Sequence, residues 1–437
     1  MMKQRTLLCT AVGFLAAAML TTTASSREGD RRDGAVHLLK TVPIPGTKAN
    51  TTGGNMYVFD ISFVDQATQT YYLADRSNAV VDVVDARTSQ LITQISATPP
   101  FRGFTGNNAT SGPNGVVAAF PWLFVTDADS RVVAIDLRNG KTVGHVSTDG
   151  APGLRADELA YDPKDGLVLA VNNADTPPFA TLISVNPVTG ALAVAKRITF
   201  DKMHSGVDAT NGAEQPVWDP VSRKFYLSIP QIGANAKDGA VIRINPAGMV
   251  EAQYPIEFCQ PAGLTLGPNV DLLANCSTVF DTAGNPWDAT KDVTAAPNVV
   301  TIDAWTGKID AVVQGVGAGD EAWYNSGDGN YYSASSTSPL RPTEVIGSTP
   351  LTAQGAAILG VIDARDQVLK QLVPTFNVPA VTTGPLVHAA STAHSVAANA
   401  GNNHVFVPLG ANNAFPNCLT GCIAVFGTHD RDERAKR

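Results

Sequence analysis

The feature that most constrains the fold is a short motif that occurs six times along the chain. In each copy an apolar, β-branched stretch ends in Asp or Asn and is followed by a turn, several of which contain Gly. Asp and Asn favour this position because they tolerate the dihedral angles of turns. A second β-rich stretch follows, so each copy predicts a β-hairpin. The six positions are Asp85, Asp136, Asn186, Asn245, Asp303 and Asp363.

A second repeated pattern of strand, turn and strand lies upstream of each hairpin. It is clearest where Tyr161-Asp162-Pro163 leads to residues 167–169 and where Trp218-Asp219-Pro220 leads to residues 224–227. Aligned on this pattern, the chain contains seven units at intervals of 43 to 74 residues. Units of three to four short strands, with no amphipathic helix between them, predict an all-β fold, a seven-bladed β-propeller. Two stacked β-sandwiches would explain the repeat less well.

The two ends of the repeat array complement each other. The last unit ends at residues 422–426 and lacks an outer strand, whereas the first unit is preceded by an apolar stretch, residues 36–44, that belongs to no unit. We expect this N-terminal strand to complete the last blade, which closes the ring and covers an open sheet edge.

The N-terminus resembles a secretory leader. Lys3 and Arg5 precede an apolar stretch, residues 7–20, and small residues follow it. No later stretch approaches the 18 apolar residues of a membrane span. We therefore predict a periplasmic or secreted protein with no membrane span. Its predicted parts are the signal peptide 1–26, the propeller 27–429 and a charged tail 430–437.

The cysteines that follow the leader form two local pairs, Cys259 with Cys276 and Cys418 with Cys422. In an oxidising compartment such pairs form disulfides. A metal site at Cys418 and Cys422 would need a second Cys or His pair at a suitable spacing, which the sequence lacks.

The formal net charge of −8 argues against a nucleic-acid partner.

The hairpin motifs resemble the YVTN or YncE-like family of exported seven-bladed propellers. The resemblance rests on strands such as Thr301-Ile302-Asp303 with their Thr-Gly turns, and it covers essentially the whole chain after the leader. It implies the fold and says little about chemistry, because propellers have many unrelated functions.

The residue that enters the inner strand of each blade should face the mouth of the central channel. Most of these seven residues are acidic or polar, and hard oxygen ligands of this kind suit Ca²⁺, Mg²⁺ or Mn²⁺. Because clustered carboxylates repel one another, a bound cation or basic ligand is expected; the alternative is a water-filled polar pore. The seven residues are Asp60, Asn114, Asp157, Glu214, Ala262, Asp320 and His394.

From this ring we predict metal ligands, ligand-binding residues and catalytic candidates. The predicted metal ligands are Glu214, Asn114, Asp157, Asp320 and His394. Further ligand-binding residues are Asp60, Asn114, Glu158, Glu321 and His388. The catalytic candidates are Glu214, His394 and Asp157.

Two short stretches resemble the SMP-30/gluconolactonase family. Glu214-Gln-Pro-Val-Trp218 is similar to that family's Glu-x-Pro-x-Trp, and Pro113-Asn114-Gly115 to its Pro-Asn-Gly; in that family both the Glu and the Asn bind a divalent ion. The order of the two stretches is reversed here, and that family has six blades.

Three functions follow as hypotheses. The first is an exported binding protein that holds a small ligand or divalent metal ion at the channel mouth, or a protein partner on its loop face, and acts as a monomer. The second is a metal-dependent hydrolase or lactonase acting on a small ester or lactone. The third is a redox subunit, although the sequence shows no Cys-x-x-Cys-His haem motif and no Walker loop, so neither haem nor nucleotide is expected.

Overall fold

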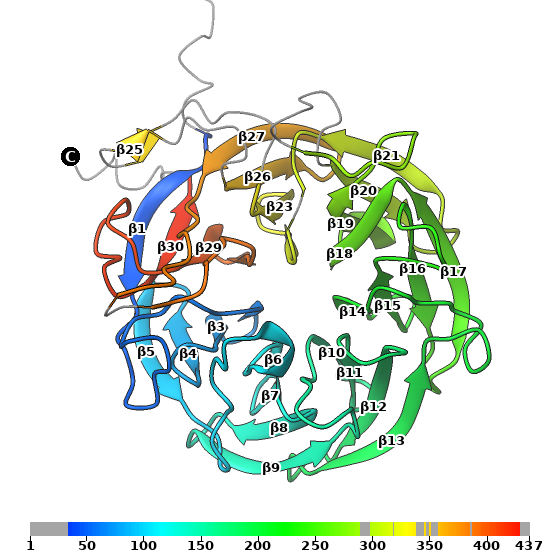
Figure 1. Cartoon of the computed structure of the whole chain (residues 1–437), viewed down its shortest axis with the longest axis horizontal. Helices are drawn as coiled ribbons and strands as arrows, with labels where there is room; N and C mark the ends of the chain where they lie inside the picture. The colour runs from blue at the N-terminus through cyan, green and yellow to red at the C-terminus, as the bar shows by residue number, and fades with distance from the viewer. Residues whose placement is uncertain are drawn as a thin grey trace, which may run out of the picture.

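The computed structural model describes residues 34–288, 298–317, 319–337, 345–346, 349–350, 357–384 and 387–428. Within these residues, seven antiparallel four-stranded sheets surround a central channel (Figure 1). The predicted seven-bladed β-propeller is confirmed. The predicted leader, residues 1–26, and the tail, 430–437, lie outside the described residues.

The blades follow one another in chain order, and the strands of each are given from the innermost to the outermost. Blade one is β2 Ser62–Asp65, β3 Thr70–Asp75, β4 Val80–Asp85 and β5 Gln90–Ile95. Blade two is β6 Val116–Ala119, β7 Trp122–Asp127, β8 Arg131–Asp136 and β9 Lys141–Ser147. Blade three is β10 Leu159–Asp162, β11 Leu167–Asn172, β12 Phe179–Val185 and β13 Leu192–Thr199. Blade four is β14 Pro216–Asp219, β15 Lys224–Ile229, β16 Asp238–Ile244 and β17 Val250–Glu257.

The last three blades complete the ring. Blade five is β18 Cys259–Leu266, β19 Asp271–Val279, β20 Asn298–Asp303 and β21 Ile309–Gln314. Blade six is β22 Ala322–Asn325, β23 Asn330–Ser335, β26 Ile358–Asp363 and β27 Val368–Pro374. Blade seven is β28 Ala397–Asn399, β29 His404–Leu409, β30 Cys422–Gly427 and β1 His37–Pro43. The remaining elements are the 3₁₀ turns η1 Asn108–Thr110 and η2 Pro268–Val270 and the short pair β24 Val345–Ile346 and β25 Thr349–Pro350.

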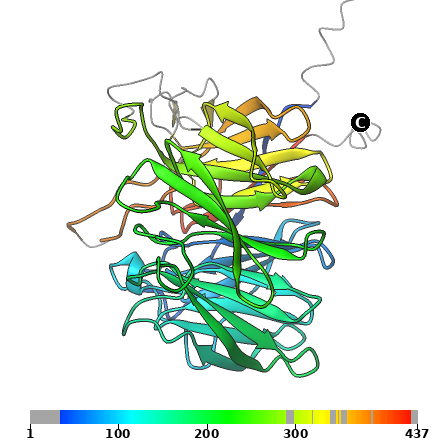
Figure 2. The same cartoon turned by 90° about the vertical axis from the view of Figure 1, so that its right-hand side faces the viewer.

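Burial along each blade explains the sequence pattern. The second and third strands, such as β3 and β4, are buried on both faces, because neighbouring blades pack against both sides of them. The outer strand β9 instead alternates between exposed and half-buried residues. The cores therefore lie between blades, and Figure 2 shows neighbouring blades side by side at the edge of the propeller.

The repeated Asp or Asn has the same structural role in each hairpin. The Asp85 Oδ1 accepts hydrogen bonds from the backbone N–H groups of Arg87 and Thr88, at 2.8 and 3.1 Å. Asn186 Oδ1 accepts from the two corresponding N–H groups of its turn, both at 3.0 Å. These turns between the third and fourth strands are what the sequence motif encodes.

The ring closes as the sequence predicts. Strand β1 pairs antiparallel with β30, from His37 opposite Gly427 to Pro43 opposite Cys422. In Figure 1, β1 lies in blue beside the red β30.

Both predicted disulfides, Cys259–Cys276 and Cys418–Cys422, are also present. No described helix is long and apolar enough to cross a membrane.

Candidate functional site

The predicted mouth residues lie at equivalent places in their blades, directly before the inner strands. The backbone N–H of Asp60 donates to the carbonyl of Ala74 at 2.9 Å, and that of Glu214 donates to the carbonyl of Ser228 at 2.9 Å. In both cases the acceptor belongs to the second strand of the same blade. The repeat therefore places these residues at one level of the channel. Ala262 differs, because it lies within the longer strand β18.

A small polar cavity of about 130 Å³ lies at this end of the channel. Its lining includes Asp60, Asp320 and His394, which precede the inner strands of blades one, six and seven. Two arginines, Arg76 and Arg155, line the same cavity. The mouth thus carries both signs of charge, whereas the polar residues predicted from the sequence are acids, an amide and an imidazole.

Arg76 connects three of the predicted residues and is almost fully buried, at 2% exposure. It comes from the turn between β3 and β4. Its Nε donates to Asn114 Oδ1 at 2.8 Å, and its Nη2 forms a close ion pair with Asp60. The same Nη2 lies 3.9 Å from Asp157 Oδ1. Asn114 also donates from Nδ2 to the carbonyl of Ala156, so both ends of its amide are engaged by the protein.

Arg155 forms the second half of this network. Its Nη2 lies 2.5 Å from Asp157 Oδ2, and its Nη1 lies 3.6 Å from Asp60 Oδ2. Arg155 stands two residues before Asp157, and in an extended chain residues two apart point to the same side. Each of the two arginines therefore lies within 4 Å of both buried aspartates and offsets their negative charge.

The ionisation of the two aspartates differs. Burial raises the pKa of Asp60, but the charges of Arg76 and Arg155 and a hydrogen bond with His394 outweigh it and bring this pKa to about 2. Burial raises the pKa of Asp157 to about 7, because Asp60 opposes its ionisation while Arg155 and Arg76 only partly compensate. The pair can therefore hold one negative charge firmly and gain or lose a second near neutral pH.

His394 is held in a fixed orientation at the mouth. Its Nδ1 lies 2.7 Å from the Thr392 carbonyl, which can only accept, so this nitrogen carries a proton. Its Nε2 lies 3.6 Å from Asp60 Oδ1, and its ring stacks on Phe59. Although burial lowers the pKa of His394, Asp60 and Asp320 raise it more, and the net shift is upward. The other predicted histidine, His388, stacks on Tyr57, which lines the cavity.

Glu214 and Asp320 complete the predicted set. Burial and the charges of Asp157 and Asp320 raise the pKa of Glu214 well above its usual value. Asp320 is exposed to solvent in the cavity. Among the described residues, no group of three or more His, Cys, Asp or Glu side chains is arranged to hold a metal ion. Arg76 and Arg155 bring positive charge next to these acids, and the predicted bound cation or basic ligand stays a prediction.

Glu158 and Glu321 lie one position further along the chain, and both are buried. Glu321 Oε2 accepts from the backbone N–H and hydroxyl of Ser62 in blade one, at 3.2 and 3.1 Å. It also accepts from the Ser395 hydroxyl at 2.6 Å and the Val396 N–H at 2.9 Å, both next to blade seven. Glu321 thus ties three blades together. Burial and the neighbouring acids raise the pKa of Glu158 well above its usual value.

The buried position of Glu321 predicts a pH-dependent stability. Burial raises its pKa from 4.5 to about 8, although the four hydrogen bonds oppose this shift. The folded state therefore binds a proton that the unfolded state has lost between these two pH values. The resulting stabilisation is complete below about pH 4.5 and is lost progressively up to pH 8. The Glu321→Gln variant, whose amide mimics the neutral acid, should melt increasingly above the wild type between pH 5 and 8.

A series of thermal melts across this pH range measures the difference in melting temperature between Glu321→Gln and the wild type. This difference should stop growing above pH 8. The matched control is Glu251→Gln, because Lys224 lowers the pKa of Glu251. That variant should show no such divergence. Parallel curves for the wild type and Glu321→Gln would contradict the prediction.

The sequence contains a weak signal for one of the missed arginines. Arg155 occupies the position two before the mouth residue, where blades two and four have Gly112 and Gly212. No comparable alignment identifies Arg76, which reaches the mouth from the turn between the second and third strands of its blade.

The comparisons with known proteins bear on the fold. No protein-family model and no curated protein matches the chain. The structure is similar to Kuenenia stuttgartiensis hydrazine synthase, with 14% identity and a TM-score of 0.59 over 88% of this chain and 99% of that one. It is also similar to the WD40 β-propeller domain of Doa1, with 12% identity and a TM-score of 0.53 over 91% and 98%. At this identity the likeness shows a β-propeller and assigns no family.

Proposed function

We propose that the chain is an exported binding protein that takes up a small polar molecule at the mouth of its central channel. The observation that carries this proposal is the convergence of Arg76, Arg155, Asp60, Asp320 and His394 on one cavity. Asp60, Arg155, Asp320 and His394 precede the inner strands of blades one, three, six and seven, and Arg76 lies in the turn between β3 and β4 of blade one. Sites that recognise small molecules typically present a few convergent polar groups of this kind.

The charges at the mouth favour a ligand with both donor and acceptor groups. A guanidinium has five N–H donors, and the described hydrogen bonds of Arg76 use two of its nitrogens. Asp320 is exposed and offers an acidic acceptor in the same cavity. A zwitterion or a small hydroxylated acid could contact both groups, and the cavity of about 130 Å³ limits the bound part to a few heavy atoms.

The divalent ion and the hydrolase remain the alternatives to test. Hydrolysis would need the ion to polarise a carbonyl group. Elemental analysis of the purified protein and an ester and lactone screen, each with and without chelator, address both. Turnover that is lost with chelator would support the hydrolase in place of a binding protein.

The binding proposal predicts that Asp320 determines ligand recognition. Thermal melts with a panel of amino acids, small hydroxy acids and monosaccharides should identify compounds that raise the melting temperature of the wild type. Asp320→Asn should remove most of this ligand effect while the protein alone melts normally, because Asp320 is exposed.

Asp310→Asn provides the matched control, since Asp310 is an exposed acid on the outer strand β21. It should respond to ligand like the wild type. If no compound stabilises the protein, or if Asp320→Asn responds fully, the mouth is a solvated polar pore.

A further inference from the structure

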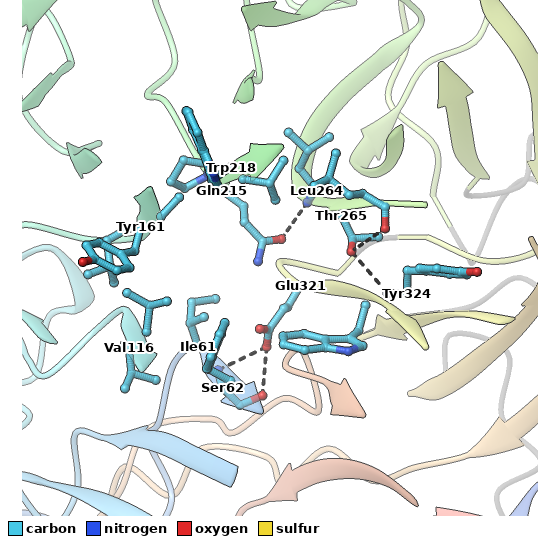
Figure 3. Close-up of a pocket in the computed structure, with 18 of the residues that line it drawn as sticks. Ile61, Ser62, Val116, Tyr161, Gln215, Trp218, Leu264, Thr265, Glu321 and Tyr324 are labelled. Carbon is cyan, nitrogen blue, oxygen red and sulfur yellow. Dashed lines mark hydrogen bonds between the residues drawn. The ribbon is translucent and has the colours of Figure 1, made fainter. Parts of the chain in front are cut away.

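A second and larger cavity, of about 720 Å³, occupies the opposite part of the channel. It is lined by the inner strands β2, β6, β10, β14, β18 and β22 and by the turns that follow several of them. The polar mouth lies before these strands, so the two cavities lie toward opposite ends of the channel. We call this larger cavity the inner chamber, and Figure 3 shows its lining. No residue of the predicted site except Glu321 lines it.

The walls of the inner chamber are apolar and include several aromatic rings. Trp218 and Tyr161 lie on one side in Figure 3, and Tyr324 lies on another. Trp218 packs at 4.6 Å between ring centroids against Phe225 in the second strand of its blade, which holds it in place from behind. Rigid aromatic walls give flat apolar molecules a large contact area at little entropic cost.

Gln215 presents a polar group to the chamber. Gln215 is 9% exposed, and its Oε1 accepts the backbone N–H of Leu264 at 2.6 Å. A backbone N–H can only donate, so the atom facing it must be the amide oxygen. The Nε2 therefore points away from Leu264 and toward the chamber, as Figure 3 shows. No described hydrogen bond uses this NH₂ group, so it remains available to a ligand.

The lining disfavours an anionic ligand. It contains no Lys, Arg or His, and Glu321 is its only Asp or Glu. A buried anion would find no counter-charge there, and burying an unpaired charge is costly. The volume falls within the range of about 300–1,000 Å³ typical of sites for drug-sized molecules.

We propose that the inner chamber is a second binding site, which takes a neutral, mainly aromatic molecule bearing a hydrogen-bond acceptor such as a ketone. Gln215 Nε2 donates to that acceptor, and Trp218, Tyr161 and Tyr324 contact the rings. This site does not depend on the ligand proposed for the mouth.

The probe for this site is prodan, a neutral naphthalene ketone whose emission reports both polarity and hydrogen bonding of its carbonyl group. The full chain should bind it saturably with a blue shift. Trp218→Ala should weaken binding about tenfold, since it removes an aromatic wall. Gln215→Leu should weaken binding about three- to tenfold and shift the emission of the bound dye further to the blue, because the ketone loses its hydrogen bond.

Three further variants complete the experiment. Val217→Trp fills the chamber from a half-buried lining position and should abolish binding, which tests the proposal even if Gln215→Leu does not fold. Trp305→Ala, which removes a tryptophan that is 52% exposed on an outer turn, should bind prodan normally. Asp320→Asn should also bind normally, which separates this site from the mouth. Absence of saturable binding, or unchanged binding by both Trp218→Ala and Val217→Trp, would overturn the proposal.

Discussion

A chain that begins at residue 47 and so lacks β1 should lose its cooperative native fold or melt far below a chain that begins at Gly34. Val36, Val42 and Ile44 are almost fully buried, and they pack into two different inter-blade cores. Burial of each such side chain contributes about 1.5–3 kcal/mol. Together they approach the whole net stability of a typical domain, which is about 5–15 kcal/mol.

Hydrogen bonds add to this loss. Strand β1 pairs with β30, and Val36 exchanges two hydrogen bonds with the side chain of Gln371 in blade six, at 2.8 and 2.7 Å. Far-UV circular dichroism and calorimetry of the two chains measure the effect. A synthetic peptide of residues 34–46, added in trans, should restore the melting temperature, because it supplies the missing strand. If the shorter chain melts like the longer one, β1 does not hold the ring closed.

The fold could be predicted because its determinants are local. The Asp or Asn at the end of each third strand binds the backbone of its own turn, as Asp85 and Asn186 do. Such a contact requires Asp or Asn at one position of the turn, so the same residue type recurs in the sequence of each blade. The closing strand could be predicted from residues 36–44 as well, because the extra strand at the N-terminal end of the repeats matched the strand missing from the last blade.

The charge balance of the mouth could be predicted only in part. The repeat aligned Asp60 and Asp157 with their counterparts because they occupy equivalent backbone positions. Arg76 belongs to a turn, and its long side chain reaches the mouth from outside that column. Side-chain reach of this kind depends on the distance between blades, which a repeat alignment does not contain.

The inner chamber could not be predicted for a different reason. Val116, Leu159 and Leu264 line the chamber and also belong to inter-blade cores, so their apolar character does not distinguish the two surroundings. Whether such residues meet one another or face an open space depends on the diameter of the ring. The orientation of the Gln215 amide likewise depends on the folded structure, because its oxygen accepts from the backbone N–H of Leu264, a residue of another blade.

The Arg76→Met variant should be the most destabilising single substitution at the mouth, by about 3–5 kcal/mol at neutral pH. Removal of this guanidinium leaves Asp60 without its closest counter-charge and Asn114 Oδ1 without its donor, both in a buried environment. The loss of unfolding free energy should be smaller at pH 4 than at pH 8. At pH 4 the unpaired aspartates can take up protons and so lose their charge. Urea unfolding at both pH values measures it.

A double variant separates the charge effect from simple loss of packing. Arg76→Met combined with Asp60→Asn removes both charges of the pair, so it should be more stable than Arg76→Met alone. The matched control is Arg87→Met, because Arg87 pairs with Asp85 at 3.0 Å but is largely exposed. Exposed pairs contribute little, so the control should unfold like the wild type. Equal effects of Arg76→Met and Arg87→Met would show that the mouth is hydrated enough to screen its charges, and the electrostatic basis of the proposed site would then fail.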